Sequence, residues 1–210
     1  MKSAISEATT QRLSLLLRGL KALEAEGLTT ASSALLAERF SLNSAQIRKD
    51  LAHFGEFGVR GVGYRVADLR SKLQALMGLS TPRTVVIVGA GNLGLALADS
   101  RNFNNESFKV AALFDVDGRK IGSRSKTGVP IRAVSELPQA LSAMGATIGA
   151  LAVPPDAVRE MALTLAAGGV KGLLNFAAAP LAPIPGVVVK NVDMALFLEG
   201  LTFQLASASS

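Results

Sequence analysis

Three glycines follow a short run of β-branched residues and could cradle a phosphate group. The run covers residues 85–88, and the glycines are Gly89, Gly91 and Gly94. In a dinucleotide-binding turn the first glycine allows a sharp turn, the second lets the pyrophosphate approach the backbone, and the third lets the helix pack on the sheet. Backbone N–H groups and the helix dipole would then face the phosphates. The predicted cofactor contacts here are Gly89, Ala90, Gly91, Asn92, Leu93 and Gly94.

An acidic residue ends the next predicted strand, which covers residues 109–115. Asp115 follows Gly94 by roughly twenty residues, where the acid that hydrogen-bonds the adenosine ribose is expected. Its charge favours NAD over NADP, because a carboxylate repels a 2′-phosphate. Alternatively, the glycines are present only because a tight turn between strand and helix favours glycine for steric reasons. Asp115 would then only begin the turn at residues 115–118. The strand and helix context favours dinucleotide binding.

Polar and basic side chains also gather on a helix predicted from Ser44 to about Phe54. Its apolar residues recur every three or four positions, as is typical of a helix packed on a core. Arginine can pair bidentately with guanine and lysine can neutralise a phosphate, so this face suits a helix that reads the DNA major groove. An ordinary solvated face is the alternative. The candidate DNA contacts on this helix are Ser44, Gln46, Arg48 and Lys49.

A glycine-rich segment at residues 55–66 follows that helix. Alternation of Val59, Gly61 and Gly63 with Arg60 and Tyr64 predicts a tight β-hairpin with Arg60 at its tip. An arginine on such a wing commonly enters the minor groove. Helix and hairpin together predict a winged-helix DNA-binding domain with Arg60 as a further contact.

The elements around the predicted reading helix complete a helix-turn-helix pattern. Leucines at helical spacing predict an amphipathic helix over residues 12–26, and Thr30 or Ser32 caps a second helix. A further helix covers residues 68–77, and a linker follows near residue 80. We therefore expect the winged-helix domain to span residues 1–80.

Strand and helix patterns alternate after this linker. Helices are expected at 92–100, 135–143 and 155–168, and strands at 84–88, 109–115, 148–153, 171–175 and 187–190. Such alternation predicts the α/β class, with a Rossmann-like parallel sheet wrapped by helices over residues 81–192. Ligands bind at the carboxyl ends of such strands, so Val153 and Pro154 join the predicted cofactor contacts.

The last segment, residues 193–210, reads as a helix that is apolar nearly all round. A helix of this kind must be buried against something. It either packs on its own domain or exchanges into a partner subunit.

Composition narrows the classes of function. The 210 residues include no cysteine and a single histidine, His53, which has no candidate co-ligands, so neither a disulfide framework nor a metal site is expected. Residues 1–80 hold 11 Lys and Arg against 7 Asp and Glu, which hints at a polyanionic partner for this end of the chain. With neither a signal peptide nor an apolar run long enough to span a bilayer, a cytoplasmic protein without membrane contact is expected.

Seven motifs in this order resemble the Rex family of redox-sensing transcriptional repressors, and together they cover nearly the whole chain. They are Gln-Ile-Arg-Lys-Asp-Leu at 46–51, Phe-Gly-Glu-Phe-Gly-Val-Arg-Gly-Val-Gly-Tyr at 54–64, Val-Gly-Ala-Gly-Asn-Leu-Gly at 88–94, Phe-Asp-Val-Asp at 114–117, Leu-Ala-Val-Pro at 151–154, Gly-Leu-Leu-Asn-Phe-Ala at 172–177 and Asn-Val-Asp at 191–193.

The resemblance implies a homodimer whose C-terminal helices swap between subunits. Such a dimer binds a palindromic operator in double-stranded DNA while NADH is scarce and is released when NADH binds. By the same resemblance, Arg18 and the partner's Asp193 belong to a switch network, and Met194 lies near the partner's nicotinamide pocket. Family members often carry a tyrosine in a Tyr-x-x-Phe arrangement where this chain has Ser100, so the part that Ser100 takes in the switch stays open.

Two other functions compete with that of a repressor that senses the NADH/NAD ratio. An NAD-dependent dehydrogenase needs a positioned acid or base, but no histidine or tyrosine follows residue 80, which leaves lysines such as Lys109, Lys171 and Lys190 and the carboxylates. The chain is therefore predicted not to be an enzyme. The second alternative is a DNA-binding regulator that senses a different nucleotide.

Overall fold

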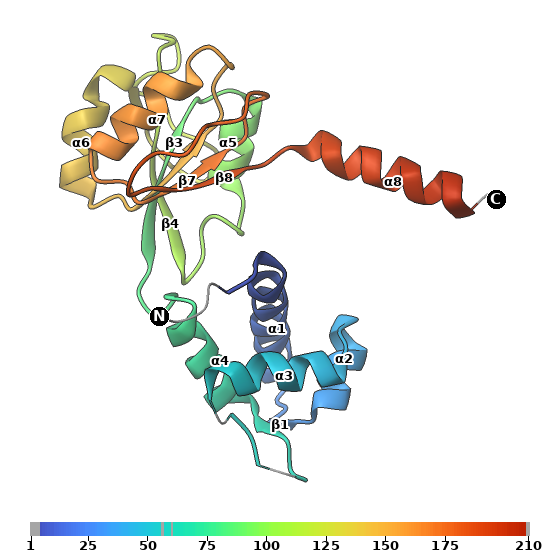
Figure 1. Ribbon diagram of the computed structural model, residues 1–210. Helices are drawn as coiled ribbons and strands as arrows, with labels where there is room; N and C mark the ends of the chain where they lie inside the picture. The colour runs from blue at the N-terminus through green and yellow to red at the C-terminus, as the bar shows by residue number, and fades with distance from the viewer. Residues whose placement is uncertain (1–4, 56, 60, 209–210) are drawn as a thin grey trace. The chain divides into compact units, whose positions relative to one another are not determined.

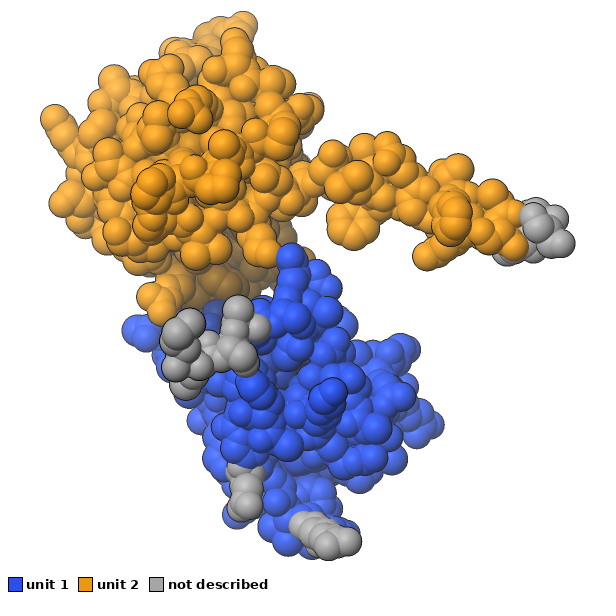
Figure 2. Space-filling model, in the orientation of Figure 1, with its two compact units in different colours: residues 1–81 blue, residues 82–210 orange. Residues whose placement is uncertain are grey.

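The chain divides into two compact units, Met1–Thr81 and Pro82–Ser210, which Figure 2 shows in different colours. The computed structural model describes residues 5–55, 57–59 and 61–208. One hydrophobic core lies in the first unit, and two lie in the second.

The N-terminal unit is mainly helical and contains one short sheet (Figure 1). Its elements in chain order are α1 (Glu7–Ala25), β1 (Thr30–Ala31), α2 (Ser33–Phe40), α3 (Ser44–Phe54), β2 (Tyr64–Arg65) and α4 (Val66–Leu76). β1 pairs antiparallel with β2. All four helices contribute leucine or isoleucine side chains to a single core, so α3 is held on a platform made by the other three.

Side-chain caps determine where these helices begin. α1 begins at Glu7, earlier than the predicted residue 12, because the Ser6 hydroxyl accepts a hydrogen bond from the backbone N–H of Thr9 at 3.1 Å. Ser32, rather than Thr30, caps α2. The predicted bounds of α3 are confirmed, and Asn43 caps it through the N–H groups of its first turn.

The segment after α3 forms a tight hairpin, as the sequence predicts. Val59 and Gly63 form an antiparallel bridge with two backbone hydrogen bonds of 3.0 Å. The strand that follows, β2, pairs with β1. Arg60, predicted at the tip of the hairpin, lies outside the described residues.

The C-terminal unit alternates strands and helices. Its elements are β3 (Arg83–Val88), α5 (Asn92–Asp99), β4 (Phe108–Asp115), β5 (Ile131–Ala133), the 3₁₀ turn η1 (Val134–Glu136), α6 (Leu137–Met144), β6 (Ile148–Leu151), α7 (Val158–Ala167), β7 (Gly172–Asn175), β8 (Val188–Asn191) and α8 (Met194–Ala208). The sequence prediction missed β5, because a strand of three residues is too short for its alternation to be recognised.

All neighbouring strands of the six-stranded sheet are parallel, and their order is β5-β4-β3-β6-β7-β8. This is the order of a doubly wound Rossmann sheet, whose topological switch point lies between β3 and β6. Val86 and Val88 of β3 face the core that includes residues of α6 and α7, whereas Val85 and Ile87 face the core that includes Ala98 of α5. The parallel sheet covered by helices is therefore confirmed.

The C-terminal helix α8 is exposed along its described length. Every residue from 194 to 207 is exposed, and the exposed fractions of Phe197 and Phe203 are 77% and 74%. Packing of α8 on its own domain, one of the two sequence expectations, is therefore not observed. None of the helices in the described ranges combines the length and apolar character needed to cross a bilayer.

Candidate functional site

A cavity of about 650 Å³ opens at the carboxyl end of the parallel sheet, beside the switch point. Residues from the ends of β3, β4 and β6 and from the start of α7 line it. These residues are Val88, Gly89, Gly91, Phe114, Asp115, Val116, Lys120, Val134, Ala152, Val153, Pro154, Ala157, Glu160 and Met161.

The glycines of the turn between β3 and α5 differ in what surrounds them. Gly89 has φ +100°, and a Cβ there would overlap the backbone carbonyl of Ala152 after β6. A Cβ on Gly94 would overlap the carbonyl oxygen of Gly89, so the helix could not pack this close to the turn. A Cβ on Gly91 would meet nothing within 4 Å. Gly89 and Gly94 thus serve the fold itself, while Gly91 keeps open space beside the first turn of α5.

Backbone N–H groups of that first turn are free of helical partners. Gly91 is the N-cap of α5, and the first helical bond runs from the N–H of Leu95 to the carbonyl of Gly91 at 2.9 Å. The N–H groups of Asn92, Leu93 and Gly94 precede this bond, and such groups at a helix N-terminus suit an anion.

Asp115 at the end of β4 ties the glycine turn to the neighbouring strand. Its Oδ2 accepts the N–H of Ala90 at 2.7 Å and lies 3.3 Å from Lys120 Nζ, and its Oδ1 accepts the N–H of Asp117 at 2.8 Å. Burial raises the pKa of Asp115, but these three donors together outweigh burial and hold the pKa below its usual value. The carboxylate is therefore ionised at neutral pH.

The structure brings together only part of the predicted cofactor set. Five of the residues line the cavity: Gly89, Gly91, Asp115, Val153 and Pro154. The other four residues predicted for the turn do not line the cavity. They lie in the turn itself and at the start of α5: Ala90, Asn92, Leu93 and Gly94. Met194 is the first residue of the exposed helix α8 and lies outside this lining.

Sequence reasoning missed several residues of the cavity wall, notably Lys120, Glu160 and Met161. Lys120 follows the Asp-Val-Asp-Gly segment directly after β4, so its basic character beside two acids was a usable signal. The two α7 residues carried no such signal, because only the packing of α7 on the sheet brings them to the cavity.

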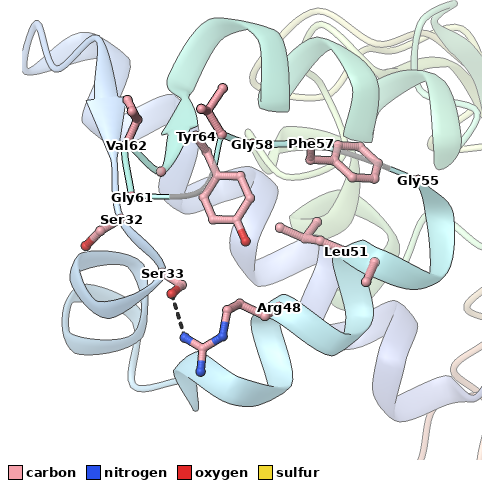
Figure 3. A pocket seen from close by; sticks show the side chains of 13 residues that line it. Ser32, Ser33, Arg48, Leu51, Gly55, Phe57, Gly58, Gly61, Val62 and Tyr64 are labelled. Atoms are coloured by element: carbon pink, nitrogen blue, oxygen red, sulfur yellow. Dashed lines mark hydrogen bonds between the residues drawn. The ribbon is translucent and has the colours of Figure 1, made fainter.

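A second cavity of about 700 Å³ lies between the start of α2, one face of α3 and the hairpin (Figure 3). Arg48 Nη1 donates a hydrogen bond to Ser33 Oγ at 2.8 Å across this space. The Tyr64 ring lies against Gly58, where a Cβ would come within 2.7 Å of the ring. Burial raises the pKa of Tyr64, so its hydroxyl stays protonated at neutral pH and can donate a hydrogen bond.

The side of α3 that faces α1 carries a partly buried ion pair. Asp50 accepts bonds from Arg12 Nε at 2.6 Å and Nη2 at 2.9 Å, and from Gln46 Nε2 at 2.7 Å. The hydrogen bond from Arg12 is the largest of several effects that lower the pKa of Asp50. Gln46 was expected to contact DNA, but its amide nitrogen is bonded within the protein. Arg48 and Lys49 are exposed on α3, and Ser44 is half-buried.

The three predicted switch residues lie in different elements. Arg18 is exposed on α1, in the N-terminal unit. Ser100 is the C-cap of α5, and its hydroxyl accepts the N–H of Asn102 at 3.2 Å. Asp193 precedes α8, and its Oδ1 accepts the N–H of Ala195 at 2.9 Å.

The described residues contain no cluster of three or more metal-binding side chains. His53 is exposed near the end of α3 and makes an edge contact with Phe54, with ring centroids 4.9 Å apart.

Two family descriptions match this chain. The family described as a CoA binding domain matches residues 80–179, and the family described as a putative DNA-binding protein N-terminus matches residues 4–52. The first range contains the turn and the cavity of the C-terminal unit, and the second contains α1, α2 and most of α3.

Curated relatives match over nearly the full length. A protein from Desulforamulus reducens named redox-sensing transcriptional repressor Rex is 45% identical, over 96% of each chain. A protein from Thermotoga maritima named redox-sensing transcriptional repressor Rex 1 is 38% identical, over 100% of each chain.

Solved structures also match over nearly the full length of both chains. A crystal structure of RSP in complex with β-NAD⁺ and operator DNA has a TM-score of 0.90 and 30% identity, over 99% of this chain and 95% of that one. The complex of RSP with β-NADH has a TM-score of 0.85 and 28% identity, over 99% of this chain and 97% of that one.

Fold and comparisons together define a class of protein, the transcriptional regulators that join a DNA-binding domain to a Rossmann-like domain. Within this class, the chain belongs to the Rex family of redox-sensing transcriptional repressors. The relatives are named as repressors and not as enzymes, in agreement with the sequence prediction.

Two glycine substitutions should separate folding from ligand binding. Gly94→Ala should lower the stability of the C-terminal unit by several kcal/mol, about the range of severe core disruption, because its Cβ overlaps a backbone carbonyl. Gly91→Ala should leave the melting temperature nearly unchanged, because its Cβ meets nothing, yet weaken dinucleotide binding by about tenfold or more if the pyrophosphate lies there. Thermal melts and a fluorescence titration with NADH measure both effects. Equal melting temperatures for the two variants would contradict the assigned roles.

Removal of the Asp50 charge should destabilise the N-terminal unit by about 2 kcal/mol, because Arg12 would lose its buried partner. The pKa of Asp50 is lowered in the fold, so this contribution is complete above the unfolded-state pKa of about 3.9 and declines as the pH falls through the folded value. Urea unfolding of Asp50→Asn and the unaltered chain at pH 7 and pH 3 measures it. Asp68→Asn, which breaks an exposed pair with Arg65, is the matched control and should change stability by about 0.5 kcal/mol at most. A similar loss in both variants would refute a special role for Asp50.

Proposed function

We propose that this chain is a repressor that binds operator DNA as a homodimer and is released by NADH, so that it responds to the NADH/NAD ratio. The observation that carries the proposal is the glycine turn, held by Asp115 at the switch point of the sheet, in the same chain as the polar helix α3. The crystal structures of the related protein RSP support it, because they contain complexes with β-NAD⁺ and operator DNA and with β-NADH.

In this proposal the cavity beside β3 and β6 holds the dinucleotide. The pyrophosphate would lie against residues 89–94, where N–H groups and the helix dipole face it. Asp115 would accept a hydrogen bond from the adenosine ribose, and Val153 and Pro154 would contact the remainder of the cofactor from the end of β6.

The DNA would meet α3 and the hairpin. Arg48 and Lys49 are exposed on α3 and supply the positive charge that phosphates and guanine require. Ser44, the amide oxygen of Gln46 and Arg60, which is outside the described residues, complete the proposed contacts. Since the operator lies on the chromosome, a cytoplasmic location belongs to this proposal.

The homodimer accounts for the exposed helix α8. Seven large apolar side chains of this helix are more than half exposed in one chain, and such a surface requires a partner. Exchange of α8 between two copies would bury it with two-fold symmetry, which also matches a palindromic operator. Residues 193–210 would then act in the partner, where the partner subunit's Asp193 would approach Arg18 and the partner's Met194 the nicotinamide.

Thermodynamic linkage between NADH binding and DNA binding would explain the release of the protein from its operator. If NADH binds the DNA-free arrangement of the dimer more tightly than the DNA-bound one, then NADH must weaken DNA binding by the same factor. Ser100 lies at the end of α5, where a tyrosine is common in this family, and would either tune this factor or abolish it. Regulation by a different nucleotide remains the alternative, and the titration below separates the two.

Operator affinity should fall by a factor of about 5 to 150 when NADH saturates the protein, because allosteric coupling usually lies in that range. The binding site is first selected from a pool of random DNA duplexes with the nucleotide-free protein. Fluorescence anisotropy then measures affinity for that duplex with NADH, NAD or NADPH present. Equal affinity under all three conditions would exclude the redox sensor but leave DNA binding intact. Release by an unrelated nucleotide, and not by NADH, would establish the alternative.

Deletion of residues 193–210 should give monomers or aggregates, because α8 supplies the apolar surface that the proposed dimer buries. Light scattering on the truncated and complete chains tests this. A second variant carries both Phe197→Ser and Phe203→Ser and keeps the full chain length. Because these aromatic side chains are among the most exposed of α8, this variant should also dissociate more readily into monomers. A truncated chain that remains a well-behaved dimer would show that α8 does not hold the subunits together.

A further inference from the structure

The guanidinium group of Arg48 is tied to the first residue of α2. Its Nη1 donates a hydrogen bond of 2.8 Å to the hydroxyl of Ser33, and Figure 3 shows this bond crossing the cavity between α2, α3 and the hairpin. Within the described ranges, Ser33 is the only hydrogen-bond partner of this guanidinium group. No hydrogen bond to a described residue holds the side chain of Lys49, the next residue of α3. The two basic residues of α3 therefore differ in how firmly their charges are placed.

Ser33 is a firm anchor for this bond. The preceding residue, Ser32, caps α2, because its hydroxyl accepts the N–H of Leu35 at 3.1 Å. Leu36 of the same helix is fully buried in the core of the N-terminal unit. The cap and the core together fix the first turn of α2, so a side chain bonded to Ser33 is held relative to both helices.

The bond to Ser33 leaves most of the guanidinium group available to a ligand. Arginine carries five N–H donors, and the bond to Ser33 uses one of them. Nε and Nη2 form an edge that can donate two parallel bonds, which is the geometry that O6 and N7 of a guanine accept in the major groove. Ser33 therefore restrains Arg48 without occupying the edge that would read a base.

The charge of Arg48 also acts on Tyr64, which lines the same cavity. Burial raises the pKa of Tyr64, and the positive charge of Arg48 opposes this rise. The hydrogen bond and this electrostatic effect agree that the guanidinium group lies at the cavity, although the residue as a whole is exposed on α3.

We propose that Ser33 is a positioning residue for Arg48, which holds the guanidinium group in the orientation that reads a base and so contributes to sequence discrimination without contacting the base itself. The inference rests on the proposed function, because it takes α3 to be the helix that reads DNA. An arginine without this restraint would lose more rotamer freedom on binding. Such a loss weakens a contact by about 2- to 12-fold.

The test measures discrimination, which is the ratio of two dissociation constants: that of a duplex with one base pair changed and that of the operator. The operator is selected from random duplexes with the full-length chain, and fluorescence anisotropy gives the constants. Arg48→Ala first identifies the base pair that Arg48 reads, because discrimination is lost there. Ser33→Ala should lower discrimination at the same base pair by about fivefold and leave the other positions within about twofold.

Matched substitutions separate the hydroxyl of Ser33 from the stability of α2. Ser33→Thr keeps a hydroxyl and should hold discrimination within about twofold, whereas Ser33→Val has a similar shape without a hydroxyl and should behave as Ser33→Ala does. Ser32→Ala removes the cap of α2 and should lower the melting temperature, but it should leave discrimination unchanged. The Thr and Val variants also decide the question if a thermal melt shows that Ser33→Ala does not fold.

A double-mutant cycle completes the test. In the Arg48→Ala background, Ser33→Ala should have no further effect on discrimination, because Ser33 acts only through Arg48. Uniform weakening for every duplex that persists in this background would show that Ser33 contacts the DNA itself and would overturn the inference. Unchanged discrimination in Ser33→Ala, or in Arg48→Ala, would overturn it as well, while operator binding remained. Failure of the unaltered chain to select any duplex would instead refute the proposed function, and the inference with it.

Discussion

The close approach of backbone to backbone at the end of β3 is the constraint on which the C-terminal unit depends. Gly89 passes the carbonyl of Ala152, and Gly94 packs against the carbonyl of Gly89, with no room for a Cβ at either position. This contact joins β3 to the end of β6 at the switch point, and the cavity opens beside it. The first turn of α5, whose first N–H groups have no helical partner, follows directly after the same contact.

A second group of interactions places charged side chains beside this backbone contact. Asp115 binds the N–H of Ala90 and so holds the glycine turn against β4, while Lys120 compensates its charge. Its bond to Ala90 gives the carboxylate a structural task, and the proposed function adds a contact with the ligand.

The N-terminal unit uses a comparable arrangement. Asp50 lies on the buried side of α3. It accepts hydrogen bonds from Arg12 on α1 and from Gln46 on α3 itself. These bonds fix the helix by its inner side and leave the exposed Arg48 and Lys49 to the outer side. A rigidly held helix suits a reader of DNA, because small errors in its position would displace every base contact.

The sequence by itself determined the helix and strand pattern, the glycine turn, Asp115 and the bounds of α3, because each depends on neighbours within a few residues. It also predicted that residues 193–210 form a helix whose apolar surface requires burial against a domain or a partner. Only the tertiary structure decided that Gln46 bonds to Asp50, that Arg12 completes this pair from 38 residues away, and that Lys120 turns back onto Asp115. The short strand β5 likewise depends on its pairing with β4. Arg12 and β5 meet partners far along the chain, so local periodicity carries no record of these contacts. The bonds from Gln46 and Lys120 span only four and five residues, but each side chain had several possible partners nearby, and only the folded conformation selects one.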